Sequence, residues 1–329
     1  MDAATVSAPS PLTLFNRWQR GLPLVPRPYD ALGETVGMSG AEVIEALREG
    51  LAGGAISRVG GVFGVGAGGA AMLCAMEVAP GELDAVAAVV NAEPGVNHNY
   101  AREHRLNLWF VATAVDAGAL QASVERIERA AGVAVLRLPM RRAYRIDLGF
   151  DVDVPVTAPS TAPHAPAAPV PPAQRALAAR LEEGLPLVER PYAALGAPLG
   201  LDEGDVIAAL RDWCERGTLR RLGVVLRHHE FGITANAMTV FDVPADAIDA
   251  AGARLAAQPG VTLCYRRDAA PGWPYTLYFM VHGRERAAVL QLIEAATRAA
   301  GLADRPREVL FSTRRYKQVG GRYFGGALR

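Results

Sequence analysis

The chain has 329 residues, half of them hydrophobic, and its 34 basic side chains balance 34 acidic ones. This length suffices for two or three domains with cores of their own, and zero net charge gives no general attraction to nucleic acid or to an anionic membrane. We expect a cytoplasmic protein without a membrane segment, because no run of about 18 uncharged apolar residues and no signal-peptide pattern is present.

The first predicted domain, residues 12–66, has the pattern of a winged helix–turn–helix. A helical segment, "LTLFNRWQR", is followed by "RPYDALG", whose Pro28 suits the first turn of a helix. The periodic segment "SGAEVIEALREGLAGG" comes next and ends at Gly54. The alternating stretch "AISRVGGVFGV" then predicts the strand region of the wing.

The second predicted domain, residues 67–150, has the order strand, helix, strand, strand, helix, strand. Its segments are "AAMLCAMEVA", "GELDAVAAVVNA", "VNHNYARE", "NLWFVATAV", "ASVERIERAAG" and "VAVLRLPMRRAYRI". This order is typical of a ferredoxin-like domain, in which two helices cover one face of a four-stranded antiparallel sheet. The other sheet face is left without cover inside such a domain.

Residues 151–173 are rich in Pro and Ala and predict a semi-extended tether. After it the order of elements repeats, with a winged helix–turn–helix over 174–229 and a ferredoxin-like domain over 230–329. The segment "GLPLVPRPYDALG" from Gly21 returns as "GLPLVERPYAALG" from Gly184. We therefore predict an α+β tandem repeat folded as an intramolecular pseudo-dimer, a pseudo-two-fold pair in which the two sheets face each other and bury their open faces.

The second helix of each helix–turn–helix is acidic. The first carries one arginine against three glutamates, a net charge of −2, and its counterpart over 201–217 has a net charge of −3. Recognition helices owe much of their affinity for DNA to Lys and Arg. We therefore expect no sequence-specific binding to DNA and predict that these helices serve as scaffold.

The stretch "GVNHNYAREHRLNLWFV" holds the clearest candidate site. With a strand period of two, Val96, His98, Tyr100 and Arg102, with His104 as a further candidate, share one sheet face. A single histidine there is more often an interface residue than a catalytic one. Four polar ring or cationic groups on one face favour a binding or catalytic site.

Comparison of the halves indicates one composite site. The tyrosine and the arginine of this strand occur in both halves. His98, by contrast, aligns with Leu263, and only the second half carries His228 and His229 after its wing. Unlike histidines on like scaffolds are what a site shared by the halves requires. The Tyr and Arg pairs are Tyr100 with Tyr265 and Arg102 with Arg267.

Arginines recur in the two halves at other positions as well, and paired guanidinium groups suit a ligand with several carboxylates. The alternative for each of them is an ordinary exposed ion pair. The set consists of Arg58, Arg102, Arg142, Arg221, Arg267 and Arg314.

Several long motifs resemble those of the siroheme decarboxylases of d1-type heme and alternative heme biosynthesis. They are "GLPLVxRPYxALG", "EVIEALRE", "GxISRVGGVF", "GVNHNYAREHRLNLWFV", "RRLGVVLRHHEFGITANAM", "WPYTLYFMVHG" and "STRRYKQVGGRYF". The resemblance covers nearly everything except the N-terminal tail and the tether. It implies a fusion of two paralogous subunits that are separate in other members, in an architecture like that of the Lrp/AsnC regulators.

The same resemblance implies the reaction. Siroheme would lose the carboxyl groups of its C12 and C18 acetates and give 12,18-didecarboxysiroheme, without an added cofactor, since the iron belongs to the substrate. The partners would be siroheme or a related iron tetrapyrrole, and further decarboxylase subunits could join. The protein itself would need no metal site.

Decarboxylation leaves carbanion character that needs a proton donor, and imidazole can supply a proton near neutral pH. We place His98 and His228 at the chemistry, with His104 and His229 as competitors. Either of the first two could instead contact the substrate iron. The groups expected to position the tetrapyrrole are Tyr100, Arg102, Arg221, Tyr265 and Arg267.

Two alternatives remain open on the sequence. A transcription regulator of the Lrp/AsnC type would have the same fold and would bind DNA in response to a small ligand. A haem-binding chaperone would bind the pigment and leave its mass unchanged.

Overall fold

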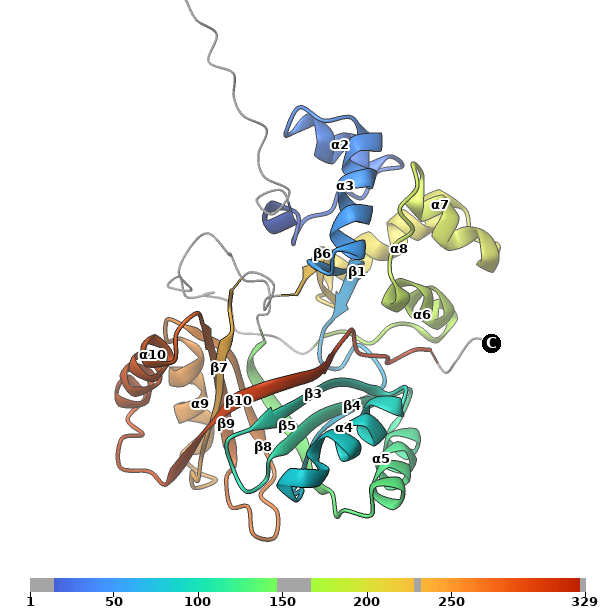
Figure 1. Ribbon diagram of the computed structural model, residues 1–329. Coiled ribbons are helices and arrows are strands. Elements are labelled where there is room, and N and C mark those ends of the chain that lie inside the picture. Colours follow the sequence, from blue (N-terminus) through green and yellow to red (C-terminus); the bar gives the residue numbers. More distant parts are fainter. Residues whose placement is uncertain (1–14, 147–166, 228–231, 326–329) are drawn as a thin grey trace, which may run out of the picture. The chain divides into compact units, whose positions relative to one another are not determined.

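The computed structural model describes residues 15–146, 167–227 and 232–325. They form two compact units (Figure 1), and each unit draws on both halves of the sequence. The first contains the described residues up to 67 and those over 167–227; the second contains 68–146 and 232–325. The predicted α+β tandem repeat of helix–turn–helix and ferredoxin-like domains is confirmed.

The first unit holds the two helix–turn–helix domains. The helices α2 and α7 begin at Pro28 and Pro191, where a residue without an N–H donor fits the first turn. A capping box of Ser39 and Glu42 starts α3. The elements are α2 (Pro28–Glu34), α3 (Gly40–Ala52) and β1 (Ile56–Phe63) from the first half, and α6 (Arg175–Glu183), α7 (Pro191–Gly196), α8 (Glu203–Glu215) and β6 (Leu219–Leu226) from the second, with 3-10 turns at Pro172–Gln174 and Ala197–Leu199.

The strand region of each wing pairs with its counterpart from the other half. Strands β1 and β6 form one two-stranded antiparallel sheet. Two further backbone hydrogen bonds extend this pairing into the repeated segments: the Leu22 N–H donates to Leu222 O at 3.1 Å and the Leu185 N–H to Val59 O at 2.7 Å. Each half has one strand here, so the partner half supplies the hydrogen bonds that a hairpin would otherwise provide.

The end of the predicted tether packs on this unit. Ala167 and Val170 are buried, and their N–H groups donate to Val65 O and Ala67 O at 3.1 and 2.7 Å. Even a Pro- and Ala-rich segment can therefore be ordered where neighbouring residues provide backbone partners and apolar cover.

The second unit holds the two ferredoxin-like domains. Helix α5 shows how the local sequence sets an element: Asp116 accepts the Ala119 N–H at its start, and Gly132 adopts a left-handed conformation at its end. The elements are β2 (Ala70–Met76), a 3-10 turn (Pro80–Glu82), α4 (Leu83–Ala92), β3 (Val96–Arg102), β4 (Leu108–Ala114), α5 (Ala117–Ala131) and β5 (Leu136–Ile146), followed by β7 (Ala235–Phe241), α9 (Ile248–Ala256), β8 (Val261–Arg267), β9 (Leu277–Gly283), α10 (Arg286–Ala299) and β10 (Arg307–Gln318).

The two sheets join into one closed barrel, in the order β10-β3-β4-β2-β5-β8-β9-β7. Two long strands make the joints. In β10, the part up to Phe311 pairs with β7 and the part from Ser312 pairs with β3, as the long red strand in Figure 1 shows. In β5, the part up to Pro139 pairs with β2 and the part from Met140 pairs with β8. Closure removes the sheet edges that a simple pair of facing sheets would expose.

Three apolar clusters fill the second unit. One lies between the sheet of the first half and α4 and α5, and a second lies between the other sheet and α9 and α10. The third, here called the inner cluster, joins both halves inside the barrel. It consists of Leu73, Ala75, Leu106, Trp109, Leu138, Met238, Val240, Tyr265, Trp273, Tyr278 and Leu310, with Val111, Met280 and other partly buried side chains packed against it.

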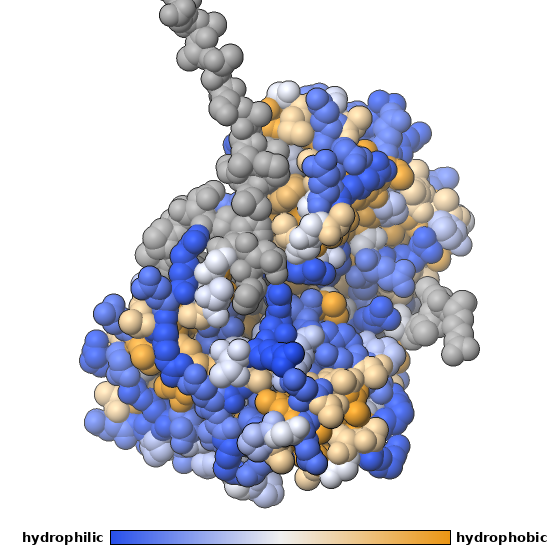
Figure 2. Space-filling model, viewed as in Figure 1, coloured by the Kyte–Doolittle hydropathy of each residue, from blue (hydrophilic) through white to orange (hydrophobic). Residues whose placement is uncertain are grey.

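Hydrophilic side chains predominate on the face of the molecule that Figure 2 shows, with apolar ones scattered among them. Among the described helices, none is both long and apolar enough to cross a bilayer.

Candidate functional site

The candidate column on β3 lies on the inner face of the barrel. His98 stands opposite Val111 and Tyr100 opposite Trp109, and both partners belong to or pack against the inner cluster. The prediction that Val96 shares this face is wrong, because a register shift between Val96 and His98 moves Val96 to the helix-covered side.

His98 is half-buried and held by its neighbour. Its Nδ1 lies 2.6 Å from Oδ1 of Asn97, and its ring stacks on Tyr100 with the centroids 6.2 Å apart. An amide oxygen only accepts hydrogen bonds, so this contact selects the tautomer with the proton on Nδ1. The imidazole is thus oriented on the inner face.

Arg102 and its counterpart Arg267 are buried inside the barrel, each with 7% of its surface exposed. Nη1 of Arg102 donates to the carbonyl oxygen of Leu310 at 2.9 Å, and Nη1 of Arg267 donates to that of Leu138 at 2.7 Å. Both acceptors lie just before the point where β10 or β5 changes its pairing partner. The two arginines therefore occupy equivalent places at the two joints.

Neither of these two guanidinium groups contacts a carboxylate within the described parts of the chain, and the Nε of each has no hydrogen-bond partner there. Burial lowers the pKa of Arg102 to about 10, so the group stays charged at neutral pH. A buried cation without a counter-charge is costly. Two such cations in one barrel favour an anionic ligand.

Tyrosines lie next to both cations. The guanidinium carbon of Arg267 is 4.7 Å from the ring centroid of Tyr265, and that of Arg102 is 5.8 Å from the ring of Tyr100. Burial raises the pKa of both phenols, which keeps them neutral hydrogen-bond donors at physiological pH.

His104 does not extend the column, because β3 ends at Arg102 and His104 lies in the turn that follows. Its Nδ1 accepts the N–H of Leu106 at 3.0 Å, and its ring meets Trp273 edge-on at 5.4 Å. Burial is the main cause that lowers the pKa of this imidazole, which favours its neutral form.

Arg221 belongs to the first unit, on β6, where its Nη1 donates to Oε1 of Gln19 at 3.2 Å. Its counterpart Arg58, on β1, donates from Nη2 to Gly61 O at 3.0 Å. His228 and His229 lie outside the described residues. The composite site that includes them therefore stays a prediction.

Two of the paired arginines form exposed ion pairs. Arg142 contacts Asp249 at 3.0 Å and Arg314 contacts Asp84 at 2.7 Å. Each of the two aspartates lies in the first turn of a helix. A tyrosine of the same strand hydrogen-bonds each aspartate. For these two arginines the alternative of ordinary surface pairs is the better interpretation.

The sequence interpretation missed one histidine on the inner face. His282 lies on β9 two residues beyond Met280, which packs against the inner cluster, and its Nδ1 is 2.8 Å from Oγ1 of the buried Thr262. The available signal was the alternation in "YTLYFMVHG", which puts Tyr278, Met280 and His282 on one side of the strand.

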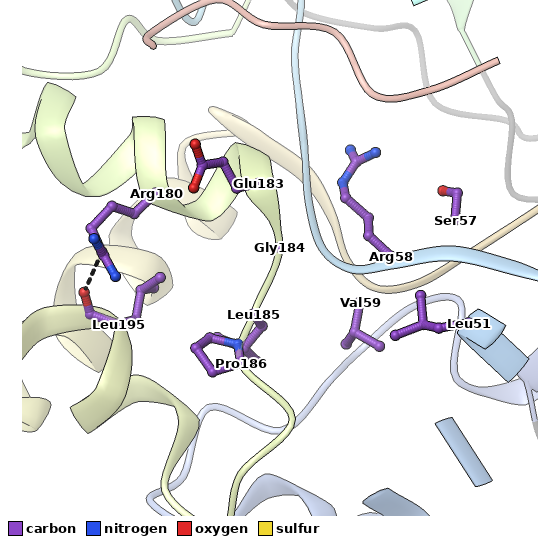
Figure 3. Close-up of a pocket in the computed structure, with 10 residues that line it drawn as sticks. All are labelled: Leu51, Ser57, Arg58, Val59, Arg180, Glu183, Gly184, Leu185, Pro186 and Leu195. Carbon is purple, nitrogen blue, oxygen red and sulfur yellow. Dashed lines mark hydrogen bonds between the residues drawn. The ribbon is translucent and has the colours of Figure 1, made fainter. Parts of the chain in front are cut away.

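The first unit contains a cavity of about 340 Å³ at its repeated segments (Figure 3). Arg180 stands at its wall and donates from Nε to the carbonyl oxygen of Leu195 at 3.1 Å. The volume is near the lower end of the range for small-molecule pockets, about 300–1,000 Å³, so it suits a small group better than a macrocycle. The lining residues are Leu51, Ser57, Arg58, Val59, Arg180, Glu183, Gly184, Leu185, Pro186 and Leu195.

Within the described ranges, no cluster of three or more His, Cys, Asp or Glu side chains could hold a metal ion. The inner face carries imidazole, phenol and guanidinium groups, which are suited to proton transfer and to binding carboxylates.

Fold and side chains define a class of protein with two helix–turn–helix domains and two AsnC-like ligand-binding domains in one chain. The model of the AsnC-like ligand binding domain matches residues 66–145 and 230–317. The model of the siroheme decarboxylase NirDL-like HTH domain matches residues 13–56 and 174–220.

Some relatives align with nearly the whole chain, and others align with about half of it. The siroheme decarboxylase NirDL subunit of Paracoccus denitrificans is 44% identical over 310 residues, which is 94% of this chain and 95% of the relative. The NirL subunit of Stutzerimonas stutzeri is 49% identical over 144 residues, 44% of this chain and 85% of its own length.

A crystal structure of the siroheme decarboxylase NirDL in complex with an iron-uroporphyrin III analogue matches with a TM-score of 0.67 and 28% identity, covering 95% of this chain and 94% of that one. This chain belongs to the siroheme decarboxylase NirDL family, a family of decarboxylating enzymes.

Proposed function

We propose that this chain is a carboxy-lyase that converts siroheme to 12,18-didecarboxysiroheme in the biosynthesis of heme d1. The observation that carries the proposal is the inner face of the barrel, where the oriented imidazole of His98 shares one strand with Tyr100 and the buried cation of Arg102. The family and the iron-porphyrin analogue bound by a solved relative support the same substrate class.

Each decarboxylation breaks the bond between an acetate methylene and its carboxylate. The electron pair left behind needs delocalisation into the macrocycle and then a proton. A positioned imidazolium supplies that proton, and its proximity replaces a collision from solution. We assign this task to His98 and to His228, with His104 and His229 as competitors, and a contact of His98 or His228 with the substrate iron stays part of the proposal.

The remaining carboxylates of siroheme need cationic and hydrogen-bonding partners. Arg102 and Arg267 are buried cations that contact no carboxylate in the described parts of the chain, and the adjacent Tyr100 and Tyr265 add neutral donors. Arg221 is the candidate from the first unit. For a carboxylate bound by Arg102 or Arg267, preorganised donors would offset the loss of solvation.

No added cofactor is part of the proposal, since the iron arrives with the substrate. A cytoplasmic location and the participation of further subunits stay predictions. The existence of separate subunits such as NirL among the relatives supports the latter.

The hydrogen bonds of the arginines on the two acidic helices disfavour the regulator alternative. Arg48 of α3 donates to Leu187 O at 3.0 Å and contacts Glu45, and Arg211 of α8 donates to Leu24 O at 3.3 Å. These guanidinium groups form hydrogen bonds within the unit, whereas a DNA-binding helix uses such groups to contact phosphates.

Incubation of the purified chain with siroheme under anaerobic conditions, followed by mass analysis, tests the proposal. We expect the pigment to lose two molecules of carbon dioxide. A pigment that binds without any change of mass would support the haem-chaperone alternative and overturn the proposal. His98→Ala and His228→Ala should each lower the rate by about 100-fold or more if the residue supplies a proton.

A further inference from the structure

We infer that His282, and not His228, supplies the second proton of the double decarboxylation, so that each half of the barrel contributes one imidazole: His98 from the first and His282 from the second. The inference rests on the proposed function and names a further residue of its site. It explains why a reaction that removes two carboxyl groups takes place on a duplicated domain.

The partners that orient the two imidazoles occupy the same position of the repeat. Asn97 and Thr262 correspond to each other, as the second residue of β3 and of β8. Nδ1 of His98 lies 2.6 Å from Oδ1 of Asn97, and Nδ1 of His282 lies 2.8 Å from Oγ1 of Thr262. In both halves the polar side chain at this position therefore orients an imidazole through Nδ1, although the histidine comes from a different strand.

Strand β9 differs from its counterpart β4 at this point. Thr113 occupies the place of His282 in the first half, and its Oγ1 lies 3.5 Å from Nδ2 of Asn97. The repeats thus keep one polar pair between neighbouring strands. The first half then adds a histidine next to Asn97, whereas the second half places one in the pair itself.

One side chain, Asn236, links His282 to a buried cation. Its cross-strand neighbour on β7 is Asn236, whose Oδ1 is 3.5 Å from Nη1 of Arg102. Arg102 belongs to the first half, so Asn236 connects the strand that carries the imidazole of one half with the cation of the other. A substrate carboxylate held by Arg102 would bring a neighbouring acetate within reach of His282.

His282 is half-buried, and Thr262 at its Nδ1 is 1% exposed. One ring nitrogen is thus held by a buried partner, while the residue as a whole is not sealed from the solvent. This is the arrangement expected of a group that must be reprotonated between turnovers.

The proton balance of each step is simple. The C–C bond to the carboxylate breaks, carbon dioxide leaves, and the electron pair passes into the macrocycle. The imidazolium then forms the new C–H bond of the methyl group and becomes neutral imidazole, which takes a proton from water. One proton is consumed for each carboxylate, and no oxidant or reductant takes part.

The test uses the full chain with His98→Gln, His282→Gln and the double variant, incubated anaerobically with siroheme. We expect each single variant to accumulate a product that has lost one carboxyl group, with the other step slowed by about 100-fold or more. The double variant should leave the mass of siroheme unchanged. His164→Gln is the matched control, a histidine of the Pro- and Ala-rich segment, and should behave like the wild type.

Two results would overturn the inference while the proposed function stands. In the first, His282→Gln forms the didecarboxylated product at the wild-type rate. In the second, both steps slow equally and no intermediate accumulates, which indicates a structural role. If the wild-type chain itself does not convert siroheme, the proposed function fails instead.

Thr262→Val and Thr262→Ser provide a second test in case His282→Gln does not fold. The valine variant removes the hydroxyl that orients His282 and should accumulate the same intermediate as His282→Gln. The serine variant restores a hydroxyl and should recover the second step. Equal activity of the two variants would show that the hydroxyl does not orient a proton donor.

Discussion

The hydroxyl of Tyr192 donates a hydrogen bond to the carbonyl oxygen of Pro23 at 2.8 Å. Its counterpart Tyr29 donates to Pro186 O at 3.2 Å, so each copy of the repeated segment holds the other. An isologous contact uses the same patch on both partners, and both copies must then keep the same residues. This explains why "GLPLV" and "RPYxALG" occur twice in one chain.

Removal of these hydroxyls should destabilise the first unit. We expect Tyr192→Phe and Tyr29→Phe each to lower the free energy of unfolding by about 1 kcal/mol, with the larger effect for Tyr192, whose hydrogen bond is shorter. Urea denaturation, together with hydrogen exchange at the Leu22 and Leu185 amides, measures the change. Tyr275→Phe is a control, because that hydroxyl contacts an exposed glutamate at 3.4 Å. Unchanged exchange at both amides would contradict this role of the tyrosines.

The buried arginines should not tolerate lysine. Lysine lacks the planar guanidinium group that reaches Leu310 O and Leu138 O. Arg102→Lys and Arg267→Lys should therefore each lower the free energy of unfolding by about 2 kcal/mol. The two effects should be similar because the two arginines occupy equivalent places. Thermal and chemical unfolding measure this cost. Arg105→Lys, an exposed position paired with Glu77, should change stability by less than about 0.5 kcal/mol. An equally small effect at Arg102 would mean that its hydrogen bond does not hold the strand joint.

Acid should weaken the pair of Glu128 and Arg137. The hydrogen bond from Arg137 and that from the Val135 N–H hold the pKa of Glu128 below its usual value of 4.5. Because the folded pKa is the lower one, this stabilisation is complete above the usual value and is lost as the pH falls through the folded pKa.

Glu128→Gln should therefore lower stability by about 0.5–1 kcal/mol at neutral pH and flatten the loss of stability between about pH 5 and pH 3. Urea midpoints over this range provide the measurement. Glu125→Gln, on the same helix but hydrogen-bonded to Gln121 instead of an arginine, should follow the wild-type curve. If the Glu128 variant keeps the wild-type slope, the pair does not contribute to the acid response.

The helix–turn–helix domains should not bind DNA. Titration of labelled duplex at low salt is expected to show no salt-dependent complex, because α3 is acidic and its one arginine donates to Leu187 O. A variant with Glu45→Lys and Glu49→Lys reverses the charge of α3 and should gain weak, salt-sensitive binding. Tight binding by the wild type would instead favour the regulator alternative.

The sequence by itself determined the duplicated order of elements, the ferredoxin-like domains, the facing sheets and the polar column on β3. These features follow from local patterns: strand and helix periods, Pro at helix starts, Gly at helix ends, and an open apolar sheet face that needs a partner. The motifs that resemble siroheme decarboxylases also belong to the sequence alone.

Only the tertiary structure decided which strands pair between the two halves. Backbone groups form the ladder, and a side-chain pattern does not specify whether β5 and β10 stop at the edge of one sheet or continue onto the next. For the same reason, the sequence did not predict the pairing of β1 with β6 or the register shift that turns Val96 away from His98. His282 needed the structure as well, because its partner Thr262 is a neighbour only across two paired strands.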